Sequence, residues 1–141
     1  MGAYKIVAVG TDGSESSFRA VDRAAVVAAD SAATLLIICA YHPSKSAPAD
    51  AEAHVVGSTP AEETLRGARE RASAKGVTDV DTIAVEGDPV EMMINTVADR
   101  RADLVVVGNR GLNSIAGRFV GSVPQGVSRR AGADVLIVHT T

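Results

Sequence analysis

Residues 4–14, YKIVAVGTDGS, join a short apolar run to a tight turn. Tyr4–Gly10 is rich in residues that favour strands, and it predicts a β-strand that ends at a glycine. The following TDG cluster predicts a turn, and Ser14 is of the type that caps helices. The next segment, Glu15–Ser31, repeats apolar residues at intervals of three and four, which predicts a helix. The stretch therefore reads as strand, turn and helix.

The same unit recurs along the chain on both sides of a long loop, His42–Ser58. Helices are predicted to begin at Pro60, after a possible Thr59 cap, and at Pro89, after Asp88. A weaker helix is expected at Ser122–Ala131, because Gly126 lies in its interior. Four further strands are predicted at Thr34–Tyr41, Val80–Glu86, Asp103–Gly108 and Ala133–His139.

The strand at Val80–Glu86 has a mixed pattern typical of a sheet edge, whereas the other four predicted strands are continuous apolar runs. Such runs are typical of a parallel sheet with helices on both faces. We therefore expect one α/β domain over residues 1–141. It would be a Rossmann-like, three-layer α/β/α sandwich. Its sheet would have five parallel strands in the order 3-2-1-4-5.

Composition narrows the possible functions. The 141 residues carry a formal net charge of −3 and only 3% aromatic residues, which argues against a nucleic-acid-binding surface. The single cysteine, Cys39, lies within an apolar run and predicts a buried, inert thiol. No apolar run is long enough for a membrane span, and no signal peptide precedes the first strand. We expect a soluble, cytoplasmic protein with no nucleic-acid or membrane partner.

Two loops stand out as candidate binding elements. In open parallel sheets, ligands bind beyond the carboxyl ends of the strands where the winding reverses, here between the first and fourth strands. One loop is Gly10–Ser14, and the other runs from Gly108 to Ser122. Both should line one crevice.

The second loop has the chemistry of an anion site. Gly108, Gly111 and Gly121 would let backbone N–H groups approach a phosphate, and Ser122 heads a predicted helix whose N-terminus favours negative charge. Arg110 adds positive charge. A Walker-type loop and a GxGxxG motif after the first strand are both absent from the sequence.

The spacing G-x2-G-x9-G-S in this loop resembles the nucleotide motif of the ATP-binding class of universal stress proteins. The resemblance covers essentially the whole chain, from the D-G-S turn at Asp12 to the closing strand at 133–139. It implies a regulatory module of the stress response that binds ATP or another adenine nucleotide. Mg²⁺ is a further candidate ligand. It also implies a homodimer formed through Val135–Val138.

The candidate nucleotide-binding residues come from the two loops and the neighbouring strand ends. The resemblance places Asp12 near the adenine and ribose, and Ala40 against the adenine. With so few aromatic residues, the base would lie against aliphatic walls such as Val9, Ala40 and Val107. Backbone hydrogen bonds would then recognise it, so several adenine nucleotides could be accepted. The candidates are Gly10, Thr11, Asp12, Ala40, Val107, Gly108, Asn109, Arg110, Gly111, Gly121, Ser122 and Val123.

Other functions stay open on the sequence. A slow ATP hydrolase related to adenine-nucleotide α-hydrolases is the main alternative, although no side chain is placed by the pattern as a catalytic base, nucleophile or dedicated metal ligand. A phosphoacceptor receiver domain shares the strand–helix alternation. It would need a lysine after the last strand, where this chain has His139.

Overall fold

The computed structural model describes residues 2–41, 60–109 and 132–140. Within these ranges the chain forms five strands and three helices. In chain order they are β1 (Ile6–Gly10), α1 (Glu15–Ser31), β2 (Thr34–Tyr41), α3 (Pro60–Ala74), β3 (Val80–Glu86), α4 (Pro89–Arg100), β4 (Leu104–Gly108) and β5 (Asp134–Val138).

The strands form one parallel sheet in the order β3-β2-β1-β4-β5, as the sequence predicts. Strand β1 lies in the middle, paired to β2 on one side and to β4 on the other. The winding of the chain therefore reverses between β1 and β4, which confirms the expected switch point.

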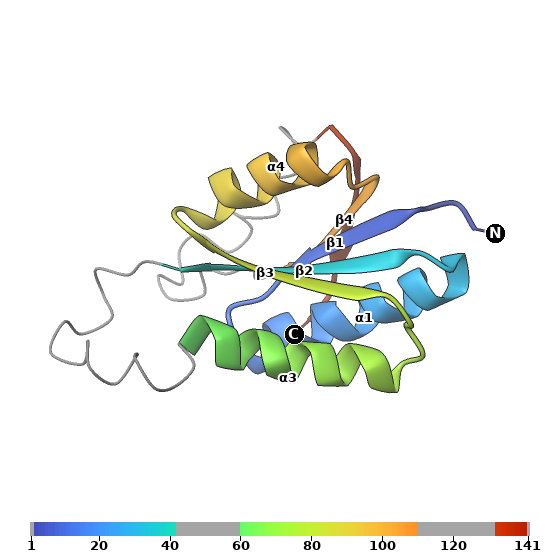
Figure 1. Ribbon diagram of the computed structural model, residues 1–141, viewed down its shortest axis with the longest axis horizontal. Coiled ribbons are helices and arrows are strands. Elements are labelled where there is room, and N and C mark those ends of the chain that lie inside the picture. The colour runs from blue at the N-terminus through green and yellow to red at the C-terminus, as the bar shows by residue number, and fades with distance from the viewer. Residues whose placement is uncertain (1, 42–59, 110–131, 141) are drawn as a thin grey trace, which may run out of the picture.

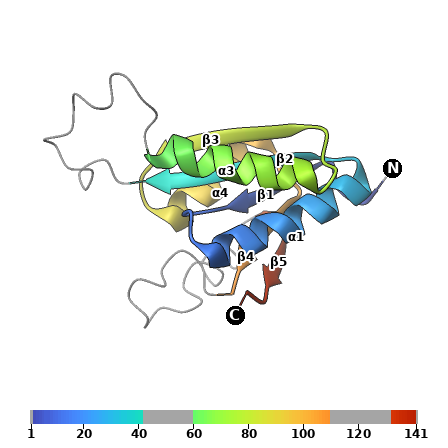
Figure 2. The ribbon, with the colours of Figure 1, turned by 90° about the horizontal axis from the view of Figure 1, so that it is seen from below.

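Helices cover both faces of the sheet. Helices α1 and α3 lie side by side on one face, and α4 lies on the other (Figure 1 and Figure 2). Each face has its own apolar core. The larger core packs α1 and α3 against residues such as Val7 and Ile37, and the smaller packs α4 against Ala8 and Ile38. The three-layer prediction is confirmed for these elements.

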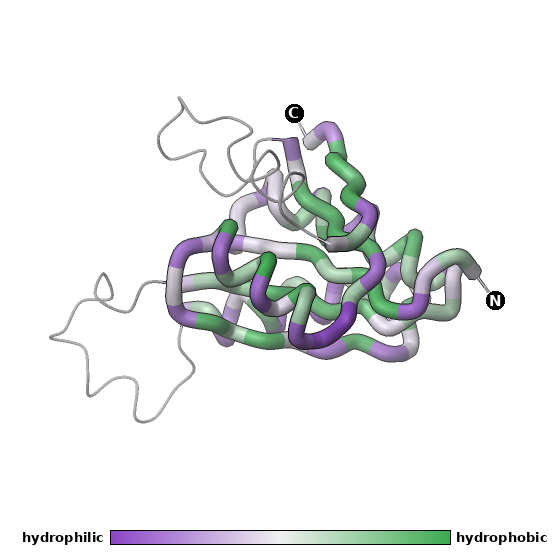
Figure 3. The backbone as a smooth tube through the Cα atoms, turned by 90° about the horizontal axis from the view of Figure 1, so that it is seen from above, coloured by the Kyte–Doolittle hydropathy of each residue, from purple (hydrophilic) through white to green (hydrophobic). Residues whose placement is uncertain are grey.

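Local signals explain where the helices begin and end. Ser14 accepts a hydrogen bond from the N–H of Ser17, and Asp88 accepts one from the N–H of Glu91, so both predicted caps are confirmed. Ala32 and Arg101 end α1 and α4 in the left-handed conformation. Purple and green alternate along the helical turns in Figure 3, as expected for helices with one buried face.

Strands β3 and β5 are the two edge strands of the sheet, as the predicted order requires. On β5, Ile137 is 48% exposed and only Val138 is buried, although the run is as apolar as a central strand. An apolar run shows that a strand is hydrophobic, not how much of it is covered.

Some sequence predictions concern residues outside the described ranges. These are the loop His42–Ser58, the Thr59 cap and the helix Ser122–Ala131. None of the three described helices combines the length and hydrophobicity that crossing a membrane requires.

Asp103 links the start of β1 to the start of β4 by hydrogen bonds. Its carboxylate accepts hydrogen bonds from the backbone N–H groups of Lys5 and Ile6, each over a shortest distance of 3.0 Å. Burial raises the pKa of Asp103. The N–H groups of Ile6, Lys5 and Asp103 itself, with the charge of Lys5, outweigh burial, so the pKa is lowered overall.

This arrangement predicts a pH-dependent contribution to stability. A carboxylate whose folded-state pKa is lowered stabilises the fold above its unfolded pKa, near 4, and loses that effect as the pH falls through the folded value. We expect Asp103→Ala to reduce the free energy of unfolding by about 1 kcal/mol at pH 7, because the group is partly solvated. The difference from wild type should shrink below about pH 4.

Urea unfolding at pH 7 and pH 3 measures this difference. Asp99→Ala, which removes an exposed carboxylate on α4, is the control. A gap between wild type and Asp103→Ala that stays constant with pH would contradict the assigned role of the ionised carboxylate.

Candidate functional site

The carboxyl ends of β1 and β4 lie side by side at the switch point. Val9 is in register with Val106, so the next residues along, Gly10 and Val107, are neighbours as well. The two loops singled out in the sequence leave the sheet from these adjacent strand ends. The structure therefore brings the starts of both candidate loops together.

The loop after β1 is held by a chain of hydroxyl groups. Thr11 is fully buried, and its hydroxyl lies 2.7 Å from the hydroxyl of Ser17 on α1. The Thr11 oxygen also accepts a hydrogen bond from the N–H of Gly13, and the N–H of Asp12 donates to Ser17. The Thr11 side chain thus shapes the turn from within. Because the Thr11 hydroxyl is used within the turn, Thr11 would contact a ligand through its backbone.

Gly13 has a conformational reason to be glycine. Its φ of 89° is in the left-handed region, and a Cβ there would come within 2.9 Å of the Thr64 hydroxyl on α3. The turn therefore packs closely on the first turns of α3, a contact that the sequence pattern did not indicate.

Asp12 and Ala40 lie near each other at the ends of β1 and β2. Asp12 is exposed, and one of its carboxylate oxygens accepts the N–H of Ser14 at 2.9 Å. Burial, with a smaller contribution from the charge of Asp12, raises the pKa of Cys39 to about 11. The N–H of Thr11 donates to the Ile38 carbonyl at 2.9 Å, so Asp12, the next residue, leaves β1 beside the end of β2. The raised pKa also fits the predicted inert thiol.

The three residues named as aliphatic walls for the base lie on different faces of the sheet. Val9 packs in the core beneath α1 and α3, whereas Val107 packs in the core beneath α4. Ala40 follows Ile38 by two residues and so points to the α4 face, where it is half-buried. Alternate strand residues point to opposite faces, so Val9 is on the other face of the sheet from Ala40 and Val107.

The space beside Gly10 is filled by protein. A Cβ at this position would lie 2.8 Å from the sulfur of Met93 on α4 and 3.3 Å from its terminal methyl carbon. Gly10 is one of the candidate nucleotide contacts from the sequence. The structure adds a packing reason for this glycine, namely that Met93 needs the room.

Gly108 and Asn109 meet the end of the chain beyond β5. A Cβ on Gly108 would lie 3.2 Å from the Cγ2 of Thr140. The Asn109 side-chain oxygen accepts hydrogen bonds from the N–H and the hydroxyl of Thr140, at 2.8 and 3.0 Å. These two candidate residues are thus tied to Thr140, which is 3% exposed.

The remaining candidates lie outside the described residues. They are Arg110, Gly111, Gly121, Ser122 and Val123. Among the described residues, no three His, Cys, Asp or Glu side chains gather where they could hold a metal ion.

Three residues at this end of the sheet were missed in the sequence. Ser16 contacts the Thr140 hydroxyl at 2.7 Å, and an Arg19 guanidinium nitrogen donates to the Thr140 carbonyl at 3.0 Å. No local pattern could have identified these contacts, because Ser16 and Thr140 are 124 positions apart.

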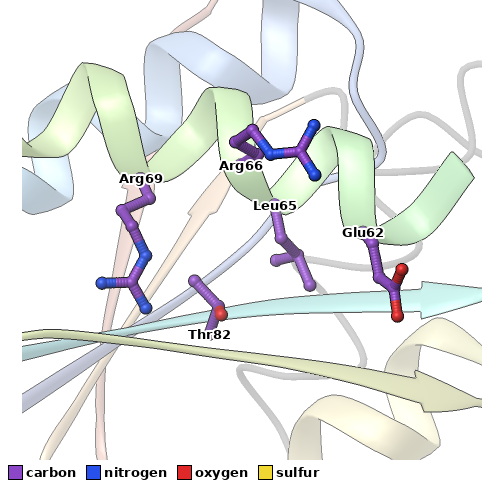
Figure 4. A pocket seen from close by; sticks show the side chains of 5 residues that line it. All are labelled: Glu62, Leu65, Arg66, Arg69 and Thr82. Atoms are coloured by element: carbon purple, nitrogen blue, oxygen red, sulfur yellow. The ribbon is translucent and has the colours of Figure 1, made fainter. Parts of the chain in front are cut away.

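A separate groove lies between α3 and β3. It is lined by Leu65, with Thr82 from β3 and charged residues on successive turns of α3, namely Glu62, Arg66 and Arg69 (Figure 4). None of its lining residues is a candidate from the sequence, and it lies beside the β3 edge and not at the switch point.

Comparison with known proteins identifies close relatives. A model of the universal stress protein family matches residues 3–139. Universal stress protein Rv1636 of Mycobacterium tuberculosis is 51% identical, with 100% of both chains covered. A putative universal stress protein of Staphylococcus aureus is 35% identical, over 97% of this chain and 85% of its own.

A solved structure is similar at comparable identity. It is a crystal structure of a universal stress protein in complex with cAMP, 48% identical to this chain. The match has a TM-score of 0.77 and covers 99% of this chain and 100% of that one.

Proposed function

Because this chain belongs to the universal stress protein family, we propose that it binds an adenine nucleotide at the switch point between β1 and β4 and acts as a regulatory module. The observation that carries the proposal is the relative that binds cAMP, which is 48% identical over nearly all of this chain. At that identity and coverage, a shared binding mode is the simplest expectation. The adjacent ends of β1 and β4 support the same location.

The proposed contacts divide between the two loops. Asp12 is exposed beside the end of β2, where it can reach the base and ribose together with the backbone around Ala40. The glycines and Ser122 of the second loop would receive the phosphate through backbone N–H groups and the helix N-terminus. Gly108 and Asn109 stand at the start of that loop, directly after β4.

Two kinds of adenine nucleotide have support. The G-x2-G-x9-G-S spacing favours ATP, and Mg²⁺ could accompany its phosphates. The relative solved with cAMP favours a cyclic monophosphate. Aliphatic surroundings and backbone recognition of the base would accept either ligand. We therefore propose a site that takes both, with their relative affinities set by the second loop.

Calorimetric titration of the whole chain tests the proposal. ATP, AMP and cyclic AMP are added in turn, each with and without Mg²⁺. We expect saturable binding of at least one of them with one site per chain, whereas inosine monophosphate, which changes the base edge, should bind more weakly. If no adenine nucleotide binds at millimolar concentration, the proposal is wrong.

The same samples separate a binding module from a slow hydrolase. ADP and phosphate released from ATP are followed over hours for wild type and Asp12→Ala. A regulatory module should release neither above the protein-free background. Turnover that Asp12→Ala abolishes would replace the regulatory function with hydrolysis.

We also propose a homodimer formed along β5. This strand is at the edge of the sheet, and Ile137 on it is 48% exposed, so the unpaired edge carries a large apolar side chain at the surface. Pairing two copies along this edge would cover it. Sedimentation analysis at micromolar concentration measures the mass, and a monomer at all concentrations would exclude the dimer.

A further inference from the structure

We propose that Thr140 is a positioning residue of the nucleotide site, which orients the side-chain amide of Asn109 and ties it to the start of α1. The inference rests on the proposed nucleotide-binding function. It goes further by assigning a role to a residue beyond the last strand, outside every motif in the sequence.

The evidence begins with the burial and contacts of Thr140. The residue is 3% exposed, although its side chain is polar. Buried polar groups are stable only when they are hydrogen-bonded, and Thr140 uses all of its polar groups. Its N–H and hydroxyl contact Asn109, its hydroxyl also contacts Ser16, and its carbonyl accepts from Arg19.

The donor inventory fixes the direction of each bond. A backbone N–H can only donate, so the Asn109 atom 2.8 Å from the Thr140 nitrogen must be the carbonyl oxygen. The Thr140 hydroxyl also donates to this oxygen, at 3.0 Å. Its single proton is then used, so Ser16 must donate to Thr140 across the 2.7 Å contact.

These directions leave the Asn109 amide group with one orientation. Its oxygen is held by two donors from Thr140, and its NH₂ group is therefore turned away from Thr140. The backbone of Asn109 is held as well, because its N–H donates to the Val138 carbonyl at 2.8 Å. An NH₂ group fixed in this way can donate to an acceptor oxygen of a nucleotide without first losing conformational freedom.

Gly108 makes the arrangement possible. A Cβ at this position would lie 3.2 Å from the Cγ2 of Thr140, which is closer than most Cβ contacts, and 3.5 Å from its hydroxyl oxygen, which is an ordinary contact. The first glycine of the motif therefore makes room for Thr140. As a result, the end of β4, the end of β5 and the first turns of α1 meet at one side chain.

The contacts of Ser16 extend the arrangement to the other loop. Ser16 is on the first turn of α1, next to Ser17, whose hydroxyl contacts Thr11 and the N–H of Asp12. The two loops that flank the switch point are thus joined through adjacent serines. Removing the Thr140 hydroxyl would loosen Asn109 and the start of α1 together.

The test compares two conservative substitutions at position 140. Thr140→Val keeps the shape and removes the hydroxyl, whereas Thr140→Ser keeps the hydroxyl and removes the methyl group. We expect Thr140→Val to weaken binding of cyclic AMP and ATP about tenfold and Thr140→Ser to bind within about twofold of wild type. Thr34→Val is the matched control, because it removes another threonine hydroxyl bond, to Asp79. Thr34 is at the start of β2, which is at the opposite end of the sheet from Thr140.

Affinity is measured by calorimetry at 25 °C, and melting temperatures are recorded alongside. A purely structural role would lower the melting temperature of Thr140→Val and leave its affinity unchanged, and this outcome would overturn the proposal. Should Thr140→Val fail to fold, Ser16→Ala interrupts the same network from α1 and should weaken binding severalfold. Unchanged affinity in that variant would also overturn it.

The failures of the two proposals are distinguishable. A wild-type chain that binds no adenine nucleotide refutes the proposed function and, with it, the role of Thr140. A wild-type chain that binds normally, together with Thr140→Val of equal affinity, refutes only the positioning role.

Discussion

Gly121→Asp is expected to weaken adenine-nucleotide binding at least a hundredfold, which corresponds to about 3 kcal/mol. In the sequence motif this glycine directly precedes Ser122, at the proposed phosphate end of the site. An aspartate there would add a side chain where backbone N–H groups are expected to approach the ligand. It would also add a negative charge beside the phosphate, and repulsion between close like charges amounts to several kcal/mol.

Gly132→Asp supplies the matched control for this substitution. It makes the same chemical change, and a Cβ at Gly132 would meet no atom within 4 Å. We expect it to bind ATP and cyclic AMP as wild type does. Calorimetric titration of the three proteins, with circular dichroism to verify folding, gives the comparison. Equal affinity of Gly121→Asp and Gly132→Asp would refute the assignment of Gly121 to the site.

Gly10→Val is expected to cause a large loss of stability. Gly10 is buried at the end of β1, and even a single added carbon would lie 2.8 Å from the Met93 sulfur. A branched side chain would need more room than the end of a flexible methionine can yield by small shifts. We expect the free energy of unfolding to fall by about 2–3 kcal/mol, as in other overpacked cores.

A second substitution tests the cause. Met93→Ala alone should destabilise the protein by about 2–4 kcal/mol, because it leaves a cavity beneath α4. In the double variant the valine occupies part of this cavity, so the combined loss should be smaller than the sum. Urea unfolding of all four proteins measures the coupling, with Gly132→Val as the open-position control. Strict additivity would show that Met93 does not explain the glycine.

Much of the fold was predictable because it depends on local patterns. The predicted bounds of α1, β2 and β3 coincide with the observed ones, since caps, turns and apolar runs mark them within a few residues. The sheet order was also predictable. Right-handed crossovers and the two loops at neighbouring strand ends leave few alternatives for a chain of this pattern.

The exposure of Ile137 was not predictable from the pattern, although the predicted order already placed β5 at the edge of the sheet. Residues 133–139 are as apolar as a central strand, and the run does not show which of its side chains are covered. The same limit applies to Val9, which lies on the face opposite Val107. Apolar residues look alike in sequence, and the pleat and the packing decide where each one points.

The sequence by itself determined the elements, their order in the sheet and the loops at the switch point, because helix and strand periods, caps and glycines act over a few residues. Only the tertiary structure decided which glycines make room for protein. Met93 approaches Gly10, and Thr140 approaches Gly108. It alone also joined Ser16, Asn109 and the buried Thr140 into one hydrogen-bonded network. Such contacts connect residues up to 124 positions apart, and no local pattern records which distant partner will satisfy a buried hydroxyl.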